Sequence, residues 1–242
     1  MNTDTKIALV TGANKGIGLE IARQLGHAGL TVLVGARDTK RGAQAAQTLR
    51  DEGLDARPLH LDVTHPESIE AAAQTIERDW GKLDVLVNNA GIAVEAASAS
   101  QTSMAALRET FETNFFGAFA IAHALLPLLC KAEAARIVNM SSDLSSLTLS
   151  ADPNWEFSRV NAFAYSASKT ALNALTMSLA RELRDTKIKV NSVTPGYTAT
   201  DLNPHQGTRT IEQGAREPIR LALLDENGPT AGFFDECATL PW

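Results

Sequence analysis

Tyr165 and Lys169 lie four residues apart, within an Ala- and Leu-rich stretch that predicts a helix over about residues 163–184. Side chains at this spacing share one face of a helix, so the phenol and the ammonium would lie side by side. A nearby cation favours the phenolate and lowers the pKa of a tyrosine below its usual value of about 10. The pair therefore predicts that Tyr165 is a proton donor, although the same spacing also occurs in ordinary solvated pairs.

A glycine-rich segment near the N-terminus predicts a dinucleotide-binding turn. Residues 6–10 form an apolar run typical of a buried strand, and residues 17–28 have a helical pattern. Between them, Gly12 would allow a tight turn, Gly16 would let the backbone approach a pyrophosphate, and Gly18 would let helix and strand pack closely. The start of the helix would then present unpaired N–H groups to the phosphates.

Arg37 indicates NADP rather than NAD. It follows the predicted strand 31–36 and lies 19 residues beyond Gly18, where an acidic residue binds the ribose of NAD and an arginine pairs with the 2′-phosphate of NADP. Lys15, in the glycine turn, could reach the same phosphate, and Asp38 is expected to cap the following helix. The alternative is a solvated basic face formed by Arg37, Lys40 and Arg41.

Strand and helix patterns alternate along the chain, which indicates an α/β fold: a single Rossmann-type, doubly wound parallel sheet of about seven strands with helices on both faces. Strands are expected near residues 6–10, 31–36, 56–61, 83–87, 135–140, 187–193 and 232–234. Helices are expected near residues 17–28, 39–52, 66–80, 103–112, 114–130, 163–184 and 209–224. A dinucleotide-binding half would comprise residues 1–140, and a catalytic and substrate-binding half residues 141–242.

Composition is consistent with one catalytic domain. The 242 residues are 44% hydrophobic, with no linker or repeat, and the net charge of −6 argues against nucleic acid or an anionic membrane as partner. No run of eighteen apolar residues occurs, and Met1 to Thr5 lack the features of a signal peptide, so we expect a cytoplasmic protein. Cys130 and Cys237 are expected to be buried free thiols, and no histidine or acidic pair has the spacing of metal ligands.

The motifs, taken in order, resemble the short-chain dehydrogenase/reductase family. The resemblance rests on the glycine spacing of residues 12–18, on Asn88-Asn89-Ala90-Gly91, Ser141-Ser142 and Pro195-Gly196, each at the end of a predicted strand, and on Tyr165 with Lys169. It covers nearly the whole chain. Within the family the chain is most similar to the carbonyl reductases, through residues 12–18, 35–38 and 214–242.

The resemblance implies a catalytic set of four residues. Tyr165 would protonate the carbonyl oxygen, Ser142 rather than Ser141 would hydrogen-bond it, and Lys169 would lower the pKa of Tyr165 and bind the nicotinamide ribose. Asn114 would hold a water that relays protons. The implied function is NADPH-dependent reduction of a small-molecule carbonyl, a ketone, aldehyde or quinone, to an alcohol. An NADP-dependent alcohol or steroid dehydrogenase and a non-catalytic NADP-binding sensor are the alternatives.

Further cofactor contacts are also implied by the resemblance. Asp62 and Val63 would lie by the adenine, residues 89–91 along the ribose, and Thr198 and Thr200 by the carboxamide. An ordinary capping or loop role is the alternative for Asp62 and the two threonines. The full set implied to contact NADP(H) is Gly12, Asn14, Lys15, Gly16, Ile17, Gly18, Arg37, Asp62, Val63, Asn89, Ala90, Gly91, Tyr165, Lys169, Pro195, Gly196, Thr198 and Thr200.

The segment between Ser142 and Tyr165 is longer than in the shortest family members. Its apolar residues would either line a substrate pocket or cover the helix that begins near Tyr165. In carbonyl reductases a longer insertion covers that helix and keeps the enzymes monomeric. A monomer is therefore favoured here, with a dimer or tetramer left open. The residues concerned are Leu144, Leu147, Leu149, Trp155 and Phe157.

Overall fold

Seven parallel strands form one sheet in the computed structural model, which describes residues 5–242. Their spatial order is β3-β2-β1-β4-β5-β6-β7, the order of a doubly wound fold, so the predicted fold class is confirmed. The strands are β1 (Ile7–Thr11), β2 (Thr31–Ala36), β3 (Ala56–His60), β4 (Val85–Asn88), β5 (Arg136–Met140), β6 (Lys189–Val193) and β7 (Phe233–Phe234). The sheet continues across residue 140, because β5 pairs with both β4 and β6.

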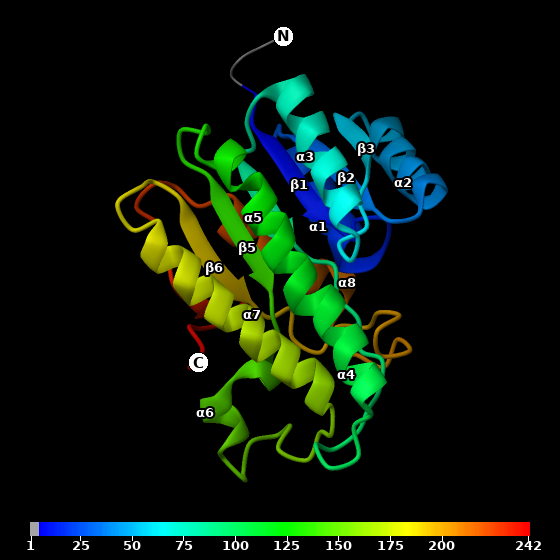
Figure 1. Ribbon diagram of the computed structural model, residues 1–242, viewed down its shortest axis with the longest axis vertical. Coiled ribbons are helices and arrows are strands. Elements are labelled where there is room, and N and C mark those ends of the chain that lie inside the picture. The colour runs from blue at the N-terminus through cyan, green and yellow to red at the C-terminus, as the bar shows by residue number, and fades with distance from the viewer. Residues whose placement is uncertain (1–4) are drawn as a thin grey trace.

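Helices cover both faces of the sheet (Figure 1). On one face lie α1 (Gly16–His27), α2 (Thr39–Asp51) and α8 (Ile211–Ala222). On the other lie α3 (Pro66–Trp80), α5 (Ala118–Leu129) and α7 (Phe163–Glu182). Every predicted strand and long helix has a counterpart, and except for the start of α5 the ends differ by at most two residues.

Two apolar layers hold the sheet between these helices. Successive side chains of a strand point to opposite faces, so in β1 Leu9 packs in the layer with α3 and α5, whereas Val10 packs in the layer with α1 and α2. The central strands are buried on both sides, which explains their continuous apolar runs. This burial fixes the strand ends at which the functional motifs lie.

The prediction of separate helices over residues 103–112 and 114–130 is wrong. Helix α4 (Met104–Phe111) continues through η1 (Glu112–Gly117), a turn of π-helix, into α5 without a break. A π-turn accommodates an extra residue inside a helix instead of ending it, and such turns are frequent at functional sites. Asn114 lies in this turn and is fully buried.

The continuous stretch Met104–Leu129 is the one helix among residues 5–242 long and apolar enough to cross a membrane, with a mean hydropathy of 1.2. Length and composition alone are weak evidence. Ile121 and Leu125 of this helix are buried in the layer against the sheet, as in the core helix of a globular domain. Packing on the sheet accounts for part of its apolar character, since 44% of the apolar window is buried.

Two short helices occupy the segment before Tyr165, where the sequence suggested no element. They are η2 (Asp143–Ser145) and α6 (Leu147–Ser150). The Ser146 hydroxyl donates to the carbonyl of Pro241 at 2.8 Å, so the segment is fastened to the C-terminus. In Figure 1, α6 lies below α7 and close to the C-terminus.

The prediction that Cys130 and Cys237 are buried is wrong, because both thiols are exposed. Cys130 follows the last turn of α5, and Cys237 lies in the turn after β7. Of the residues Met1 to Thr5 that bear on a signal peptide, Met1 to Asp4 lie outside the described part of the chain.

Candidate active site

Tyr165 and Lys169 lie on one face of α7, as the spacing predicts. The ammonium of Lys169 is 5.7 Å from the centre of the Tyr165 ring and donates a hydrogen bond of 2.7 Å to the main-chain oxygen of Met140, the last residue of β5. Lys169 is only 3% exposed, and burial lowers its pKa to about 8. Helix α7 therefore places a buried cation directly beside the phenol.

The expected lowering of the Tyr165 pKa is not found in this structure. Burial, the largest influence, raises the pKa to about 12, a hydrogen bond with Ser142 lowers it, and the charge of Asp143 raises it further. Burial disfavours both the phenolate and the ammonium, and the prediction from spacing alone did not include this cost. Tyr165 is therefore a neutral phenol at ordinary pH, which is the form that donates a proton.

Ser142 rather than Ser141 faces Tyr165. The Ser142 hydroxyl accepts from the N–H of Leu144 at 3.3 Å, and its interaction with the phenol lowers the pKa of Tyr165. Ser141 is buried, and its hydroxyl lies 2.9 Å from that of Ser145. This arrangement favours Ser142 as the second hydroxyl of the site.

Asn114 fastens the loop after β4 to helix α7. Its amide nitrogen donates to the Ile92 carbonyl at 2.9 Å and to the Ser168 hydroxyl at 3.0 Å, while its oxygen accepts from the Ile92 N–H at 2.8 Å. A Cβ added to Gly91 would lie 3.2 Å from the Lys169 ammonium, so this loop passes close to the site. Both amide hydrogens of Asn114 are already donated, which shows a positioning role, and the water relay stays a prediction.

The glycine turn between β1 and α1 fits a bound dinucleotide. Gly12 and Gly16 have φ values of +64° and +57°, in the left-handed region that favours glycine. A Cβ on Gly18 would lie 2.4 Å from the Asn89 amide nitrogen, so close packing also requires glycine here. Helix α1 has no side-chain N-cap and no acidic residue in its first turn. Its first N–H groups are thus available to an anion.

Thr11 and Asn89 hold this turn in place. The Asn89 amide donates to the carbonyls of Thr11 at 2.8 Å and of Gly12 at 3.3 Å. The Thr11 hydroxyl accepts from the N–H groups of Asn89 and Ala90, at 3.0 Å and 2.9 Å. The Asn89 side chain therefore braces the glycine turn instead of reaching along a ribose, and Thr11 is a site residue that the sequence reasoning missed.

Arg37 lies exposed after β2, with no carboxylate within ion-pair distance among residues 5–242. The prediction for Asp38 is confirmed, because its side chain accepts from the N–H groups of Lys40 and Arg41 at 3.0 Å each and caps α2. Lys15 instead forms an ion pair with Asp201. Arg37 is therefore the cation best placed for a phosphate at this strand end.

The remaining predicted contacts are largely engaged within the protein. Asp62 accepts from the main-chain N–H of Thr64 at 3.0 Å and from its hydroxyl at 2.7 Å. The Thr198 hydroxyl donates to the Pro195 carbonyl at 2.9 Å and is buried, and Thr200 belongs to a turn closed by Asn203. These bonds favour the loop roles left open for Asp62 and the threonines.

Val63 and Gly196 are set by close approaches of the backbone. A Cβ on Gly117 of η1 would lie 2.8 Å from the Val63 carbonyl oxygen. Gly196, after β6 and Pro195, has a φ of +66°, and a Cβ there would lie 2.7 Å from Arg209. Asn14, Ile17 and Ala90 are partly buried around the glycine turn. The strand ends thus bring the predicted cofactor residues to one edge of the sheet.

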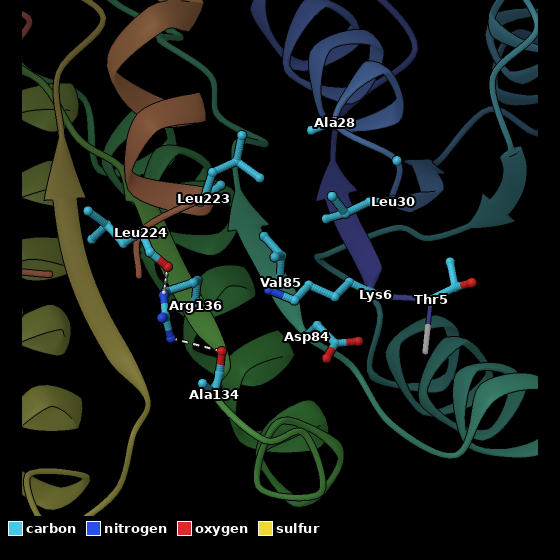
Figure 2. A pocket seen from close by; sticks show the side chains of 12 residues that line it. Thr5, Lys6, Ala28, Leu30, Asp84, Val85, Ala134, Arg136, Leu223 and Leu224 are labelled. Carbon is cyan, nitrogen blue, oxygen red and sulfur yellow. Dashed lines mark hydrogen bonds between the residues drawn. The ribbon is translucent and has the colours of Figure 1, made fainter. Parts of the chain in front are cut away.

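A cavity of about 470 Å³ lies at the opposite, amino edge of the sheet (Figure 2). Thr5, Lys6, Asp84 and Arg136 line it, together with Leu223 and Leu224. None of the predicted site residues does. Ligands of open α/β sheets bind at the carboxyl ends of strands, so this cavity is not the candidate active site. Among residues 5–242 no group of three histidine, cysteine or acidic side chains forms a metal site.

The family model described as short chain dehydrogenase matches residues 6–210. The chain therefore belongs to the short-chain dehydrogenase/reductase family of oxidoreductases. It is 35% identical to short-chain dehydrogenase/reductase 1 of Saponaria officinalis, over 98% of this chain and 96% of that protein. It is 34% identical to carbonyl reductase [NADPH] 1 of Mus musculus, with both chains fully covered. The crystal structure of NADPH-bound carbonyl reductase from chicken fatty liver is also similar, with a TM-score of 0.86, 29% identity, and coverage of 98% and 99%.

Proposed function

We propose that this protein is an NADPH-dependent reductase that converts a ketone, aldehyde or quinone to an alcohol. The observation that supports this best is that Lys169, beside Tyr165, binds the carboxyl end of β5, where Ser142 follows, and that the loop after β4 connects this lysine to the glycine turn. A dinucleotide sensor would need the turn but not these three side chains. The named carbonyl reductases among the relatives support the same reaction.

The residues present divide the chemistry between them. Bound NADPH would supply the hydride. The substrate oxygen would gain negative charge as the carbonyl carbon accepts this hydride. Ser142 would donate a hydrogen bond to that oxygen, and the neutral phenol of Tyr165 would transfer its proton to it. Lys169 would stabilise the phenolate that remains, because its ammonium lies at the ring of Tyr165. Because the fold fixes the positions of these groups, the site is preorganised for the negative charge that develops on the substrate oxygen.

The cofactor preference rests on Arg37. Its exposed guanidinium follows β2, where an arginine accommodates the 2′-phosphate of NADP. No acidic residue occupies that position, and Asp38 is already engaged as the cap of α2. NADPH is therefore expected to bind more tightly than NADH.

A panel of ketones, aldehydes and quinones tests the proposal, with NADPH consumption as the readout. We expect turnover of at least one class with NADPH, and slower turnover with NADH. Absence of turnover across the panel, with alcohols oxidised and NADP⁺ reduced instead, would support the alternative of a dehydrogenase working in the oxidising direction. Absence of turnover in both directions, with NADPH still bound, would support the sensor.

A monomeric state and a cytoplasmic location stay predictions. The segment 143–162 contacts α7 through Ser145, which hydrogen-bonds Thr170 and Asn173, and several large apolar side chains of the helices on that face remain exposed. They are Met104, Phe116, Phe119, Phe163 and Met177. Their exposure counts against a monomer, since apolar patches often mark subunit contacts. Light scattering after size exclusion decides, because a tetramer would have about four times the 25.8 kDa mass of the chain.

A further inference from the structure

The side chain of Ser145 joins the loop after β5 to helix α7, and the proposed reduction gives it no role. Ser145 lies three residues after Ser142, ends η2 and is 1% exposed. Its hydroxyl donates to the main-chain oxygen of Ser142 at 2.5 Å and accepts from the amide nitrogen of Asn173 at 2.8 Å. One buried hydroxyl thus connects the turn of Ser142 to α7.

The hydrogen bonds of the Ser145 hydroxyl use its full capacity. A serine hydroxyl has one proton and two acceptor sites. The proton is donated to the Ser142 oxygen. The two acceptor sites take the Asn173 amide and the Ser141 hydroxyl, which lies 2.9 Å away. Nothing is left for a substrate, cofactor or water, so Ser145 can act on the chemistry only by positioning other groups.

Asn173 continues the face of α7 that carries Tyr165 and Lys169. The three residues follow one another at intervals of four, the spacing of neighbours along a helix face. Asn173 is 4% exposed, so its bond to Ser145 is shielded from water. A second bond runs beside it, from the Thr170 hydroxyl to the Ser145 carbonyl at 2.9 Å. The face of α7 that holds the proton donor is therefore tied to η2.

The turn that Ser145 holds also orients the Ser142 hydroxyl. The Ser145 N–H donates to the Ser142 carbonyl at 2.9 Å, so this oxygen accepts two bonds from one residue. Within the same turn the Leu144 N–H donates to Ser142 Oγ at 3.3 Å. Because Oγ accepts inside the turn, its own proton is available to another oxygen. The proposed reduction needs that proton at the substrate oxygen.

We propose that Ser145 and Asn173 are positioning residues that set the place of the Ser142 hydroxyl relative to Tyr165. Ser142 lies on the loop after β5 and Tyr165 on α7, so a shift between these two elements separates the two hydroxyls. A displacement of about 1 Å in a catalytic group can cost about 10²-fold in rate. This inference rests on the proposed reductase function and adds two residues to the same site.

Ser145→Ala, Asn173→Ala and the double variant test the proposal. With NADPH and the best carbonyl substrate, kcat should fall about 10-fold in each single variant, as expected for a shift of less than 1 Å. KM and the dissociation constant of NADPH should change less than about twofold, because neither side chain is expected to touch a ligand. The double variant should be no slower than the single ones, since all three lack the same bond.

Ser146→Ala is the matched control. Ser146 is the next residue, is also fully buried, and its hydroxyl also makes two bonds. It donates to the Pro241 carbonyl at 2.8 Å and accepts from the Leu149 N–H at 3.1 Å. These bonds lead to the C-terminus and to α6, not to α7. Ser146→Ala should lower the urea midpoint about as much as Ser145→Ala does and leave kcat unchanged.

Three results would overturn the inference. They are a kcat of Ser145→Ala within twofold of the wild-type value, an equal loss of kcat in Ser146→Ala, and single-variant losses that multiply in the double variant. If Ser145→Ala does not fold, Asn173→Ala against Ser146→Ala makes the same comparison.

The wild-type protein separates this inference from the proposed function. If it reduces a carbonyl and the variants match it, the positioning role alone fails. If it only oxidises alcohols, the same kcat comparison is made in that direction. If it is inactive in both directions, the proposed function fails and the positioning role fails with it.

Discussion

Lys169 and Arg136 are both buried cations, at opposite edges of the same sheet. Arg136, at the amino edge, is 5% exposed, and its guanidinium donates to main-chain oxygens of Leu224, Ala134, Ala135 and Lys187 at 2.8–3.2 Å. Figure 2 shows the bonds to Leu224 and Ala134. Lys169, at the carboxyl edge, is 3% exposed and donates to one, the Met140 oxygen. Depth of burial therefore does not separate a structural cation from a functional one. The number of hydrogen bonds to the protein does, with four for Arg136 and one for Lys169.

The chemistry of the two side chains reinforces this difference. Burial lowers the pKa of both groups, but an arginine remains charged throughout the accessible pH range. The pKa of Lys169 falls to about 8, within reach of ordinary conditions. An ammonium has three N–H donors, so Lys169 retains two for a substrate, cofactor or water. Arg136 holds chain segments together through hydrogen bonds to their main-chain oxygens, whereas Lys169 lies beside Tyr165 with donors available.

The largest expected effect comes from Tyr165→Phe. Removal of the phenol hydroxyl should lower kcat by about 10²–10⁴, because general acid catalysis typically contributes that much. NADPH binding, measured by titration calorimetry, should change little. A variant that retains more than about a third of the wild-type kcat on the best substrate would remove Tyr165 from the proton-donor role.

The second prediction sets the two buried cations against each other. Arg136→Met should lower the free energy of unfolding by about 2–4 kcal/mol, because main-chain oxygens of three loops lose a charged donor. Lys169→Met should leave stability nearly unchanged or raise it, since an unpaired buried charge is removed. The same variant should lower kcat/KM about 10²-fold.

Urea denaturation and steady-state kinetics on both variants make this comparison. The distinction fails if Arg136→Met is as stable as the wild-type protein, or if Lys169→Met loses stability and activity together. If Arg136→Met loses more activity than its loss of folded protein explains, Arg136 at the amino edge of the sheet affects catalysis and is not purely structural.

The third prediction concerns the cofactor side of the site. Arg37→Ala should weaken NADPH binding about 10- to 100-fold while NADH binding stays nearly constant, because a charge-assisted hydrogen bond to the 2′-phosphate is lost. Arg41→Ala is the matched control, since Arg41 is exposed nearby but lies 3.6 Å from the Asp38 carboxylate. Equal losses for both cofactors in Arg37→Ala would place the phosphate elsewhere.

The sequence predicts the sheet well because burial on both faces leaves a strong local signal. The apolar run of β1 and the glycines after it are local patterns, formed by residues that are close in the sequence. Both lie where the sequence predicts them. The turn of π-helix at Asn114 leaves no such signal in the sequence. It is associated with hydrogen bonds from the Asn114 side chain to Ile92 and Ser168, which are distant in the chain. Contacts between distant segments escape reasoning from periodicity.

The same limit explains the errors at the site. A spacing of four residues places Tyr165 and Lys169 together, but the burial that raises one pKa and lowers the other depends on the whole fold. Residue types indicate which groups are present, and only packing shows which of them are left unsatisfied.

The smallest expected effect is the pH dependence of stability that Lys169 causes. Its pKa is 10.5 in the unfolded chain and about 8 in the folded protein, so between these values the unfolded state binds more protons. Stability therefore rises with pH across this window. From pH 8 to pH 9.5 the contribution of Lys169 should amount to about 1–2 kcal/mol.

The contribution of Tyr165 has the opposite sign and begins at higher pH. Its pKa rises from 10.0 to about 12 on folding, so it lowers stability only above pH 10. Below that pH, the difference in unfolding free energy between the wild-type protein and Lys169→Met isolates the lysine, because their other titrating groups are the same. Urea denaturation at pH 8 and pH 9.5 should show the wild-type protein gaining stability relative to the variant. A constant difference would mean that Lys169 keeps its proton in the folded state, and the contrast with Arg136 would then rest on hydrogen bonds alone.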